Sequence, residues 1–507
     1  MTQADSGSQS QLRWGIYGLL IALAVGNMAG RLLAVNSVNK TDLQKHVIGQ
    51  DLKRATAKLK ERGLSEEEFE RKLAEVKERI ENERQLQLPF LSANDRSRWL
   101  AIRALVEQGT YEIDGVIDRT LWNTIDMVQH RGRDGELHLY SSKPPLLITL
   151  LAGEYWLISK LTGMTLASDP YFIGRLMLVT INILPLMLMY VLIARLAERL
   201  GTTDWGKLFV MASATMGTLL VPFAVVLNNH IVAAVSVTVA LYAFVRIWFD
   251  GDHRPRYYAL VGVGASFAAA NELPALALLG LLAVALFLCD RRSWFVGFLP
   301  ATVVVAAAFF ATNYAAHGCL TPPYMHKSSD DPEENWYVYT YTVEGVERVS
   351  YWQNRAGIDL GEPTKLAYAW HVLVGHHGIF SLTPVWLLSM AGLVMWLRGE
   401  NRQLRQLALG IAVLSLVCLV FYIGLRPQED RNYGGMTSGF RWMFWFAPLW
   451  LVALIPAADW LANSRLRKAF ALTLLAFSVV SASYPTWNPW THPWLYRWFE
   501  YCGWVGF

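Results

Sequence analysis

The sequence is poor in charged residues and in cysteine. Only 17% of its 507 residues are charged, and the formal net charge is +4. So small and scattered a positive surplus predicts no nucleic-acid binding. The cysteines lack the spacing of metal ligands, so neither a zinc site built from cysteine nor a disulfide scaffold is indicated. They are Cys289, Cys319, Cys418 and Cys502.

Internal repeats and long stretches of alternating polarity are also missing. Membrane β-strands would alternate apolar and polar residues over about ten positions, so a β-barrel is disfavoured. Instead, 53% of the residues are hydrophobic, and 21 are Trp. The apolar residues form runs of about 17 to 25, the length a helix needs to cross roughly 30 Å of hydrocarbon. The sequence therefore predicts an all-α polytopic membrane protein.

About twelve apolar stretches are found, which predicts about 11–13 transmembrane helices. They are 14–35, 145–162, 171–194, 207–227, 231–249, 257–271, 273–289, 294–316, 369–397, 404–424, 440–460 and 467–484. The first stretch is predicted to be a retained anchor rather than a cleaved signal peptide, because it is of spanning length and only Arg13 precedes it as a basic residue. The expected location is the inner cell membrane, with multiple crossings.

The basic residues of short loops predict the orientation. Loops near 195–207, 246–256, 291–292, 398–405 and 465–468 carry Lys and Arg and are expected in the cytoplasm. This places 228–230, 317–368 and 425–440 outside. If 36–143 is also outside and every run spans once, the number of crossings between 144 and 195 is wrong by one. Either 145–162 is partial or re-entrant, or a further span lies within 87–143, or 36–143 is inside.

The predicted divisions follow from these stretches. They are a cytoplasmic N-terminus with the first helix at 1–35, a first external loop at 36–143, a transmembrane core at 144–316, an external loop at 317–368, C-terminal helices at 369–484 and an aromatic tail at 485–507. Within the first loop, the segment 40–84 is highly charged and is predicted to form a helical hairpin broken near Gly63. This hairpin is either a docking arm for a protein partner or a solvated insertion. The 317–368 loop is expected to contain a small β-hairpin turning at 343–346.

Two polar segments next to apolar runs are candidates for chemistry. Asp95 begins an amphipathic helix that also carries Arg98 and Arg103. It is either an N-cap, with the arginines at lipid headgroups, or a functional carboxylate. Lys143 precedes a Pro-Pro pair, which suits a helix start. A lysine there either binds a phosphate or extends to the membrane surface.

Together these segments resemble a known family. An Asp-x-x-Arg-aromatic helix ending in Gly-x-Tyr at 95–111, then Lys-Pro-Pro-Leu at 143–146, resembles the first external loop of GT-C glycosyltransferases. The likeness is greatest to the family 39 branch, with the protein O-mannosyltransferases and the lipid A aminoarabinose transferase. The segment 432–442 is similar to a Tyr-Gly-Gly…Gly-x-Arg-Trp passage of that family. The likeness covers about 90–460 in layout and omits the 40–84 arm.

The resemblance implies transfer of a sugar from a polyprenyl-phosphate donor to a hydroxyl of a lipid, glycan or protein acceptor at the outer face of the membrane. Asp95 would match the catalytic general base, and Lys143 the lysine that meets the lipid phosphate. Arg96 and Ser142 depart from the family pattern, which leaves a second carboxylate and a divalent metal without support, so no cofactor is expected.

Independently of the resemblance, one carboxylate and several cations suffice for such a transfer, since phosphate is a good leaving group. A single base predicts inversion at the anomeric carbon. Arg98, Arg103 and Arg441 are candidates to bind the phosphate.

Weaker candidates for substrate binding lie at membrane edges. They are Asn229, His230, Glu272, Tyr433 and His376. His230 is alternatively a loop histidine with structural partners, and Glu272 a carboxylate paired with a cation. His371, His376 and His377 are not spaced by four residues as two ligands on one helix would be, so a turn at a helix entry is expected there rather than a metal site.

Two other classes of function compete with a glycosyltransferase. A transporter or flippase of a lipid-linked or small solute would show repeats and matching broken helices. A scaffold protein would use the 40–84 arm but leave Asp95, Lys143 and Arg441 unexplained. An enzyme requires these three residues to converge on one external cavity.

Overall fold

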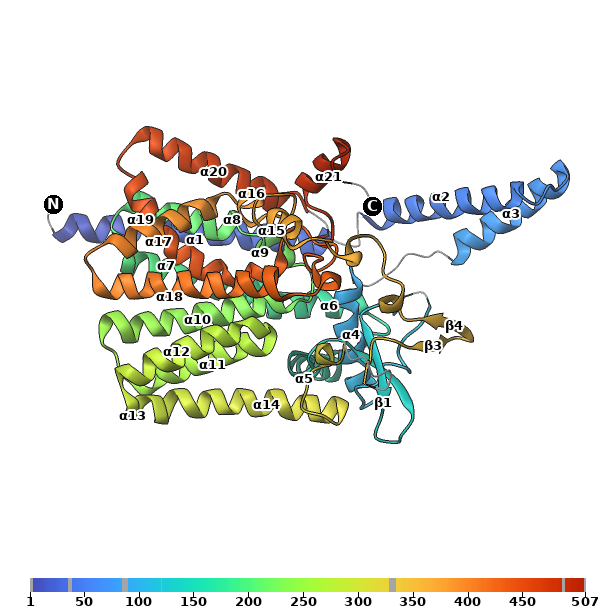
Figure 1. Cartoon of the computed structure of the whole chain (residues 1–507), viewed down its shortest axis with the longest axis horizontal. Coiled ribbons are helices and arrows are strands. Elements are labelled where there is room, and N and C mark those ends of the chain that lie inside the picture. Colours follow the sequence, from blue (N-terminus) through green and yellow to red (C-terminus); the bar gives the residue numbers. More distant parts are fainter. Residues whose placement is uncertain are drawn as a thin grey trace.

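The computed structural model describes residues 3–34, 39–83, 90–119, 121–327, 334–485 and 488–505. Most of this chain is helical, and its only strands form two separate two-stranded antiparallel sheets. Long helices run side by side along the major axis of the molecule (Figure 1). The chain is therefore an all-α polytopic membrane protein in its architecture, with small β-hairpins at one end.

Eight helical segments of the described chain are long and apolar enough to cross a membrane. They are Gln9–Ala34, Pro170–Leu200, Asp204–Phe223, Asn229–Asp250, Arg291–His317, Arg402–Leu425, Arg441–Leu461 and Arg465–Ser483. Two shorter apolar helical segments are Leu273–Cys289 and Val385–Arg398. Helix α11 (Pro255–Asn271) packs against α10 and α12 and lies along the same direction in Figure 1.

The bundle is built from the following helices. They are α1 (Gln3–Ala34), α6 (Pro170–Leu178), α7 (Leu184–Leu200), α8 (Asp204–Met216), α9 (Leu220–Phe223), α10 (Asn229–Asp250), α11, α12 (Leu276–Cys289), α13 (Arg291–Ser293), α14 (Leu299–His317), α17 (Val385–Arg398), α18 (Arg402–Leu419), α19 (Ala447–Leu461) and α20 (Arg465–Ser483). π-Helical turns at Val179–Ile183 and Trp294–Phe298 join α6 to α7 and α13 to α14, and a third at Val420–Leu425 extends α18.

The remaining elements gather at one end of the bundle, called here the hairpin end. They are α2 (Asn39–Lys60), α3 (Glu66–Glu83), α4 (Ala93–Glu107), β1 (Met127–Arg131), β2 (Leu137–Ser141), α5 (Pro145–Thr162), β3 (Thr340–Val343), β4 (Val346–Val349), α15 (Lys365–Leu373), α16 (Ile379–Leu382) and α21 (Trp494–Tyr501). In β1–β2 Met127 pairs with Ser141, and in β3–β4 Thr340 pairs with Val349. The α2–α3 hairpin turns at Gly63, whose φ is +61°, and projects from this end (Figure 1).

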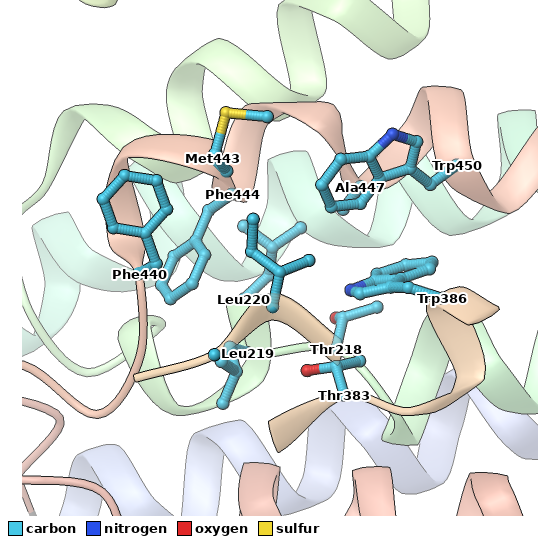
Figure 2. Close-up of a pocket in the computed structure, with 12 residues that line it drawn as sticks. Thr218, Leu219, Leu220, Thr383, Trp386, Phe440, Met443, Phe444, Ala447 and Trp450 are labelled. Carbon is cyan, nitrogen blue, oxygen red and sulfur yellow. The ribbon is translucent and has the colours of Figure 1, made fainter. Parts of the chain in front are cut away.

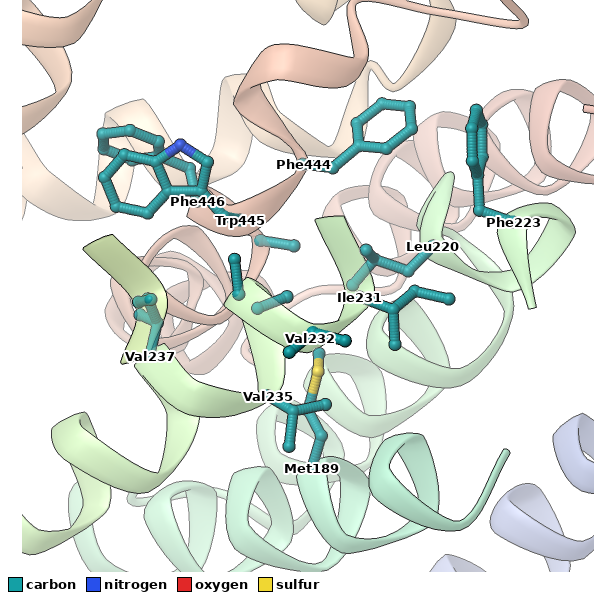
Figure 3. Packing of buried hydrophobic residues seen from close by; sticks show 14 of the residues in the cluster. Met189, Leu220, Phe223, Ile231, Val232, Val235, Val237, Phe444, Trp445 and Phe446 are labelled. Atoms are coloured by element: carbon teal, nitrogen blue, oxygen red, sulfur yellow. The ribbon is translucent and has the colours of Figure 1, made fainter. Parts of the chain in front are cut away.

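The apolar core lies where α10 and α19 meet their neighbours. Figure 3 shows Met189 of α7 beside Val235 of α10, and both residues are buried, as is Phe446 before α19. Helix α14, by contrast, leaves Val303 and Val304 more than half exposed. An apolar helix with one buried face and one exposed apolar face suits contact with lipid.

Helix α5 corresponds to the stretch 145–162, for which a partial or re-entrant helix is one of the predicted alternatives. It is not among the eight candidate spans, and Figure 1 views it nearly along its axis while the bundle helices lie across the view. Helix α4 and the β1–β2 hairpin precede α5, and the bundle helices follow it. Because α5 does not run along the bundle, α4 and both β-hairpins occupy the same end of the bundle. The Lys- and Arg-rich turns, such as the one at α13, lie at the opposite end (Figure 1).

The stretch 369–397 does not form the single helix that its apolar composition predicts. It is divided among α15, α16 and α17, with a break at 374–378 that contains two glycines. The hairpin β1–β2 was not foreseen from the sequence. The predicted aromatic tail at 485–507 contains α21, and its residues 486–487 and 506–507 lie outside the described residues.

The shared position of both hairpins gives a topology test. In a background without the native cysteines, Glu136→Cys at the β1–β2 turn and Glu347→Cys in β4 should both react with an impermeant maleimide added to intact cells. Both positions are exposed, as is Glu400 at the opposite end. Glu400→Cys should stay unlabelled until the membrane is permeabilised. Labelling of only one hairpin would contradict the arrangement.

Candidate functional site

Asp95 lies in the first turn of α4 and is only 1% exposed. The N-cap of α4 is Ser92, whose Oγ accepts a hydrogen bond from the Asp95 backbone N–H at 3.1 Å, so the N-cap interpretation of Asp95 is wrong. Its Oδ1 accepts hydrogen bonds from Trp99 Nε1 at 2.8 Å and from the backbone N–H of Leu227 at 3.0 Å. Asp95 therefore joins α4 to the non-helical segment before α10.

Burial raises the pKa of Asp95 to about 7, although the hydrogen bonds from Leu227 and Trp99 and the charges of Arg96 and Arg98 oppose the shift. A carboxyl group with this pKa is partly ionised and partly protonated near neutral pH. Such a group is suited to accept a proton at the pH of the cell.

Arg98 connects α4 to α10 through a buried polar network. Its Nη1 donates to Asn94 Oδ1 at 2.7 Å, and its Nη2 donates to Asn229 Oδ1 at 2.7 Å. Asn229 Nδ2 in turn donates to Glu272 Oε1 at 2.8 Å. Burial lowers the pKa of Arg98 to about 10, and the nearby charge of Arg441 adds to this effect. Arg98 remains a cation at neutral pH.

Arg441 enters the same network from the segment before α19. Its Nη1 donates to His230 Nε2 at 2.8 Å, which leaves His230 Nδ1 as the donor to Glu272 Oε1. Its Nε donates to the Gly434 carbonyl at 2.8 Å, and its guanidinium lies 5.0 Å from the Trp490 ring centroid. Glu272 therefore accepts hydrogen bonds from both Asn229 and His230.

Gly434 allows Arg441 to lie this close to the chain. Its φ is +94°, and a Cβ added there would stand 2.5 Å from Arg441 Nε. Any other residue would strain the backbone and displace the guanidinium.

Lys143 stands immediately before α5, where Pro144 is the N-cap and Pro145 the first helical residue. Its Nζ lies 3.1 Å from Asp126 Oδ2. Burial lowers the pKa of Lys143 to about 8; Asp126 opposes this shift, and the charges of Arg98 and Arg441 add to it. The ammonium is therefore within electrostatic reach of both guanidinium groups. Arg98, Lys143 and Arg441 are called here the cationic cluster.

Asp126 was missed by sequence reasoning. It precedes β1 in a loop whose composition carries no signal of a site, and only the folded chain shows that it pairs with Lys143. The structure brings together seven of the predicted residues. They are Asp95, Arg98, Lys143, Asn229, His230, Glu272 and Arg441.

Arg103 takes no part in the cationic cluster, contrary to the expectation that it helps to bind phosphate. Its Nε donates to Glu107 Oε2 at 2.9 Å, and its guanidinium lies 4.8 Å from the Trp122 ring centroid. The first contact is an i,i+4 pair within α4, and the second packs α4 against the following loop. The spacing of five residues from Arg98 places Arg103 on a different face of α4.

Tyr433 and His376 belong to a second group, called here the histidine cluster, which also contains Glu362, His371 and His377. Tyr433 donates through its hydroxyl to Glu362 Oε1 at 2.6 Å, and its ring stacks on His377 with centroids 4.3 Å apart. His376 Nδ1 and His377 Nδ1 form a hydrogen bond of 2.6 Å. Burial lowers the pKa of His376 to about 3 and that of His377 well below its usual range, so both rings are neutral.

An apolar pocket adjoins the segment that carries Arg441. Figure 2 shows Leu219 and Leu220 facing Phe440, Phe444 and Trp386 around it. Thr218, Gly378, Ile379, Thr383, Met443, Ala447 and Trp450 complete its lining. Because Phe440 directly precedes Arg441, the pocket and the cationic cluster are neighbours along the chain.

Fold and site together define a polytopic helical membrane protein with a buried cationic site at its hairpin end. Two solved structures of an oligosaccharyltransferase from Archaeoglobus fulgidus are similar to this chain. The apo form is 12% identical to this chain, with a TM-score of 0.43. The matched region covers 82% of this chain and 54% of the chain in that structure. The second structure is AglB in complex with an inhibitory peptide and a dolichol-phosphate. It is 11% identical with a TM-score of 0.39, and the matched region covers 81% of this chain and 53% of the chain in that structure.

This chain thus spans about half the length of the solved structures that it matches. No protein-family model matches the sequence, and no curated protein matches it.

Proposed function

We propose that this protein is a membrane glycosyltransferase of the GT-C type, which moves a sugar from a polyprenyl-phosphate donor to an acceptor hydroxyl. The observation that carries the proposal is the cationic cluster. Arg98, Lys143 and Arg441 come from three distant parts of the chain and remain close despite mutual repulsion. Asp126 pairs with Lys143 and offsets part of this positive charge, and a phosphate is an anion that arginine and lysine bind well.

In the proposed reaction Asp95 acts as the general base. Its carboxylate removes the proton of the acceptor hydroxyl as that oxygen attacks the anomeric carbon of the sugar. The bond from the anomeric carbon to the phosphate oxygen breaks, and the phosphate leaves with the electron pair. The cationic cluster stabilises the added negative charge. Attack opposite the leaving group inverts the anomeric centre.

A prenyl chain attached to the phosphate needs an apolar environment. The pocket behind Phe440 is apolar, but its volume of about 30 Å³ is too small to hold such a chain, so the pocket is not proposed as its site. Asn229, His230 and Glu272 carry hydrogen-bonding groups beside the same cations and are proposed to contact the sugar or the acceptor. The acceptor is proposed to be a lipid, a glycan or a protein.

A panel of radiolabelled polyprenyl-phosphate sugars, incubated with membranes that contain the protein, tests this function. We expect one donor to give a labelled product and nucleotide sugars to give none. Arg441→Gln should reduce the product at least about 10-fold, since a charged hydrogen-bonding group is lost. The control Arg497→Gln changes an exposed arginine that is paired only with Glu500 and should leave the product unchanged.

Movement of a lipid-linked sugar across the membrane without any transfer product would contradict the proposal and support the flippase alternative. Equal product from Arg441→Gln and wild type would remove Arg441 from the site.

A further inference from the structure

A second group of polar side chains lies beside the proposed catalytic site and takes no part in it. Glu362 ends the external loop before α15, His371 lies near the end of α15, and His376 lies in the turn at 374–378. One ligand atom of each residue lies within 4.8 Å of those of the other two. Two imidazoles and one carboxylate form a typical ligand set for a transition metal.

The break in the helix explains how residues five apart meet. On a continuous helix His371 and His376 would point in different directions, and this spacing speaks against a metal site. The helix ends at Leu373, however, and the turn carries His376 back so that its ring stacks on His371 with centroids 3.9 Å apart. Gly375 permits this turn, because a Cβ there would stand 2.5 Å from His371 Nδ1.

The protein itself leaves ligand atoms of this group unused. His371 Nδ1 is buried and has no hydrogen-bond partner in the part of the chain that the structure describes. Glu362 accepts the Tyr433 hydroxyl on Oε1, which leaves Oε2 for another interaction. His376 uses Nδ1 toward His377, which leaves Nε2. A buried polar atom without a protein partner is explained by a bound water or a bound ion, among other causes.

We propose that Glu362, His371 and His376 bind a single zinc ion, or another first-row divalent ion that favours imidazole. Ligands about 2.0 to 2.2 Å from a tetrahedral ion lie about 3.4 Å apart. The observed separations of up to 4.8 Å exceed this distance, and the stacked rings of His371 and His376 must turn as they bind, because the lone pair of an imidazole lies in the plane of its ring. Three protein ligands leave a fourth position for water. Magnesium and calcium are disfavoured because they take oxygen ligands.

The contacts around the site indicate what the ion does. The Tyr433 hydroxyl supports the carboxylate of Glu362, as outer hydrogen bonds commonly do for metal ligands. Tyr433 is followed by Gly434, whose carbonyl accepts the hydrogen bond from Arg441 Nε. The ion would thus fix the loop that positions Arg441. The metal site itself does not depend on the proposed transfer reaction.

Zinc binding by the purified full chain in detergent tests the proposal. After dialysis against a chelator, isothermal titration with Zn²⁺ should show one tight equivalent, and Co²⁺ should give the intense visible bands of a four-coordinate site. Glu362→Gln and His376→Gln should each weaken Zn²⁺ binding at least about 10-fold, on the scale that lost ligand contacts produce. The control His253→Ala removes a histidine at the opposite end, where its Nδ1 contacts only Tyr258, and should bind like wild type.

Absence of a tight equivalent in wild type, or a Co²⁺ spectrum of the six-coordinate aqueous ion, would overturn the proposal. So would variants that bind zinc as tightly as wild type. The wild-type spectrum decides the question even where a variant fails to fold.

Discussion

Asp95→Asn is expected to lower sugar transfer at least about 100-fold while the protein stays folded, the scale of a lost general base. The amide keeps an oxygen that can accept the hydrogen bonds from Trp99 and Leu227. It cannot take a proton from the acceptor. Transfer should be measured with purified protein and a saturating donor, beside the thermal unfolding temperature of both proteins.

The unfolding measurement separates a catalytic role from a structural one, because Asp95 also connects α4 to the start of α10. Asp134→Asn is the matched control, since Asp134 is an exposed acid at the β1–β2 turn that contacts His138. Near-normal turnover of a folded Asp95→Asn protein would remove Asp95 from the mechanism.

Lys143→Ala should weaken binding of the donor phosphate about 10- to 100-fold, the range for loss of a charged hydrogen bond. Binding of the acceptor should change much less, because the ammonium is proposed to contact only the phosphate. Titration with a non-transferable polyprenyl-phosphate analogue measures the first effect. Lys160→Ala is the control, since Lys160 is an exposed lysine on the same helix.

The pH dependence of binding provides a second measurement of the same contact. The pKa of Lys143 is lowered to about 8, so the ammonium is present below this pH and is lost as the pH rises through it. Donor affinity of the wild type should therefore fall between about pH 7 and pH 9. Lys143→Arg should keep its affinity over this interval because arginine stays charged. A flat profile for wild type would contradict the assignment.

A helix of the bundle could be predicted where particular residues in the sequence indicate both its first and its last residue. The run 231–249 corresponds to α10, which Asn228 caps at its start and Gly251 ends with a φ of +64°. The run 369–397 does not form one helix, but its glycines and histidines predicted the turn that the structure has at 374–378. For 145–162 the sequence left a partial or re-entrant helix as one of several alternatives, since an apolar helix beside the bundle has the same composition as one within it.

The candidate site could be predicted only in part. Asp95, Lys143 and Arg441 lie in short motifs with unusual polarity next to apolar runs, and such residues stand out in a sequence. Asp126 and Glu362 do not, because a single acid in a polar loop is common. Their importance comes from the partners that the fold provides. Asp126 lies beside Lys143, and Glu362 lies beside His371 and His376.

The ring of Trp490 beneath Arg441 has a consequence for the order in which the protein is made. Lys143 and Arg98 are synthesised early, whereas Trp490 follows every bundle helix of the chain. Ser438 also donates its backbone N–H to the Pro489 carbonyl, so this late segment holds the loop before Arg441 as well. The site therefore cannot be complete while the nascent chain is still being inserted.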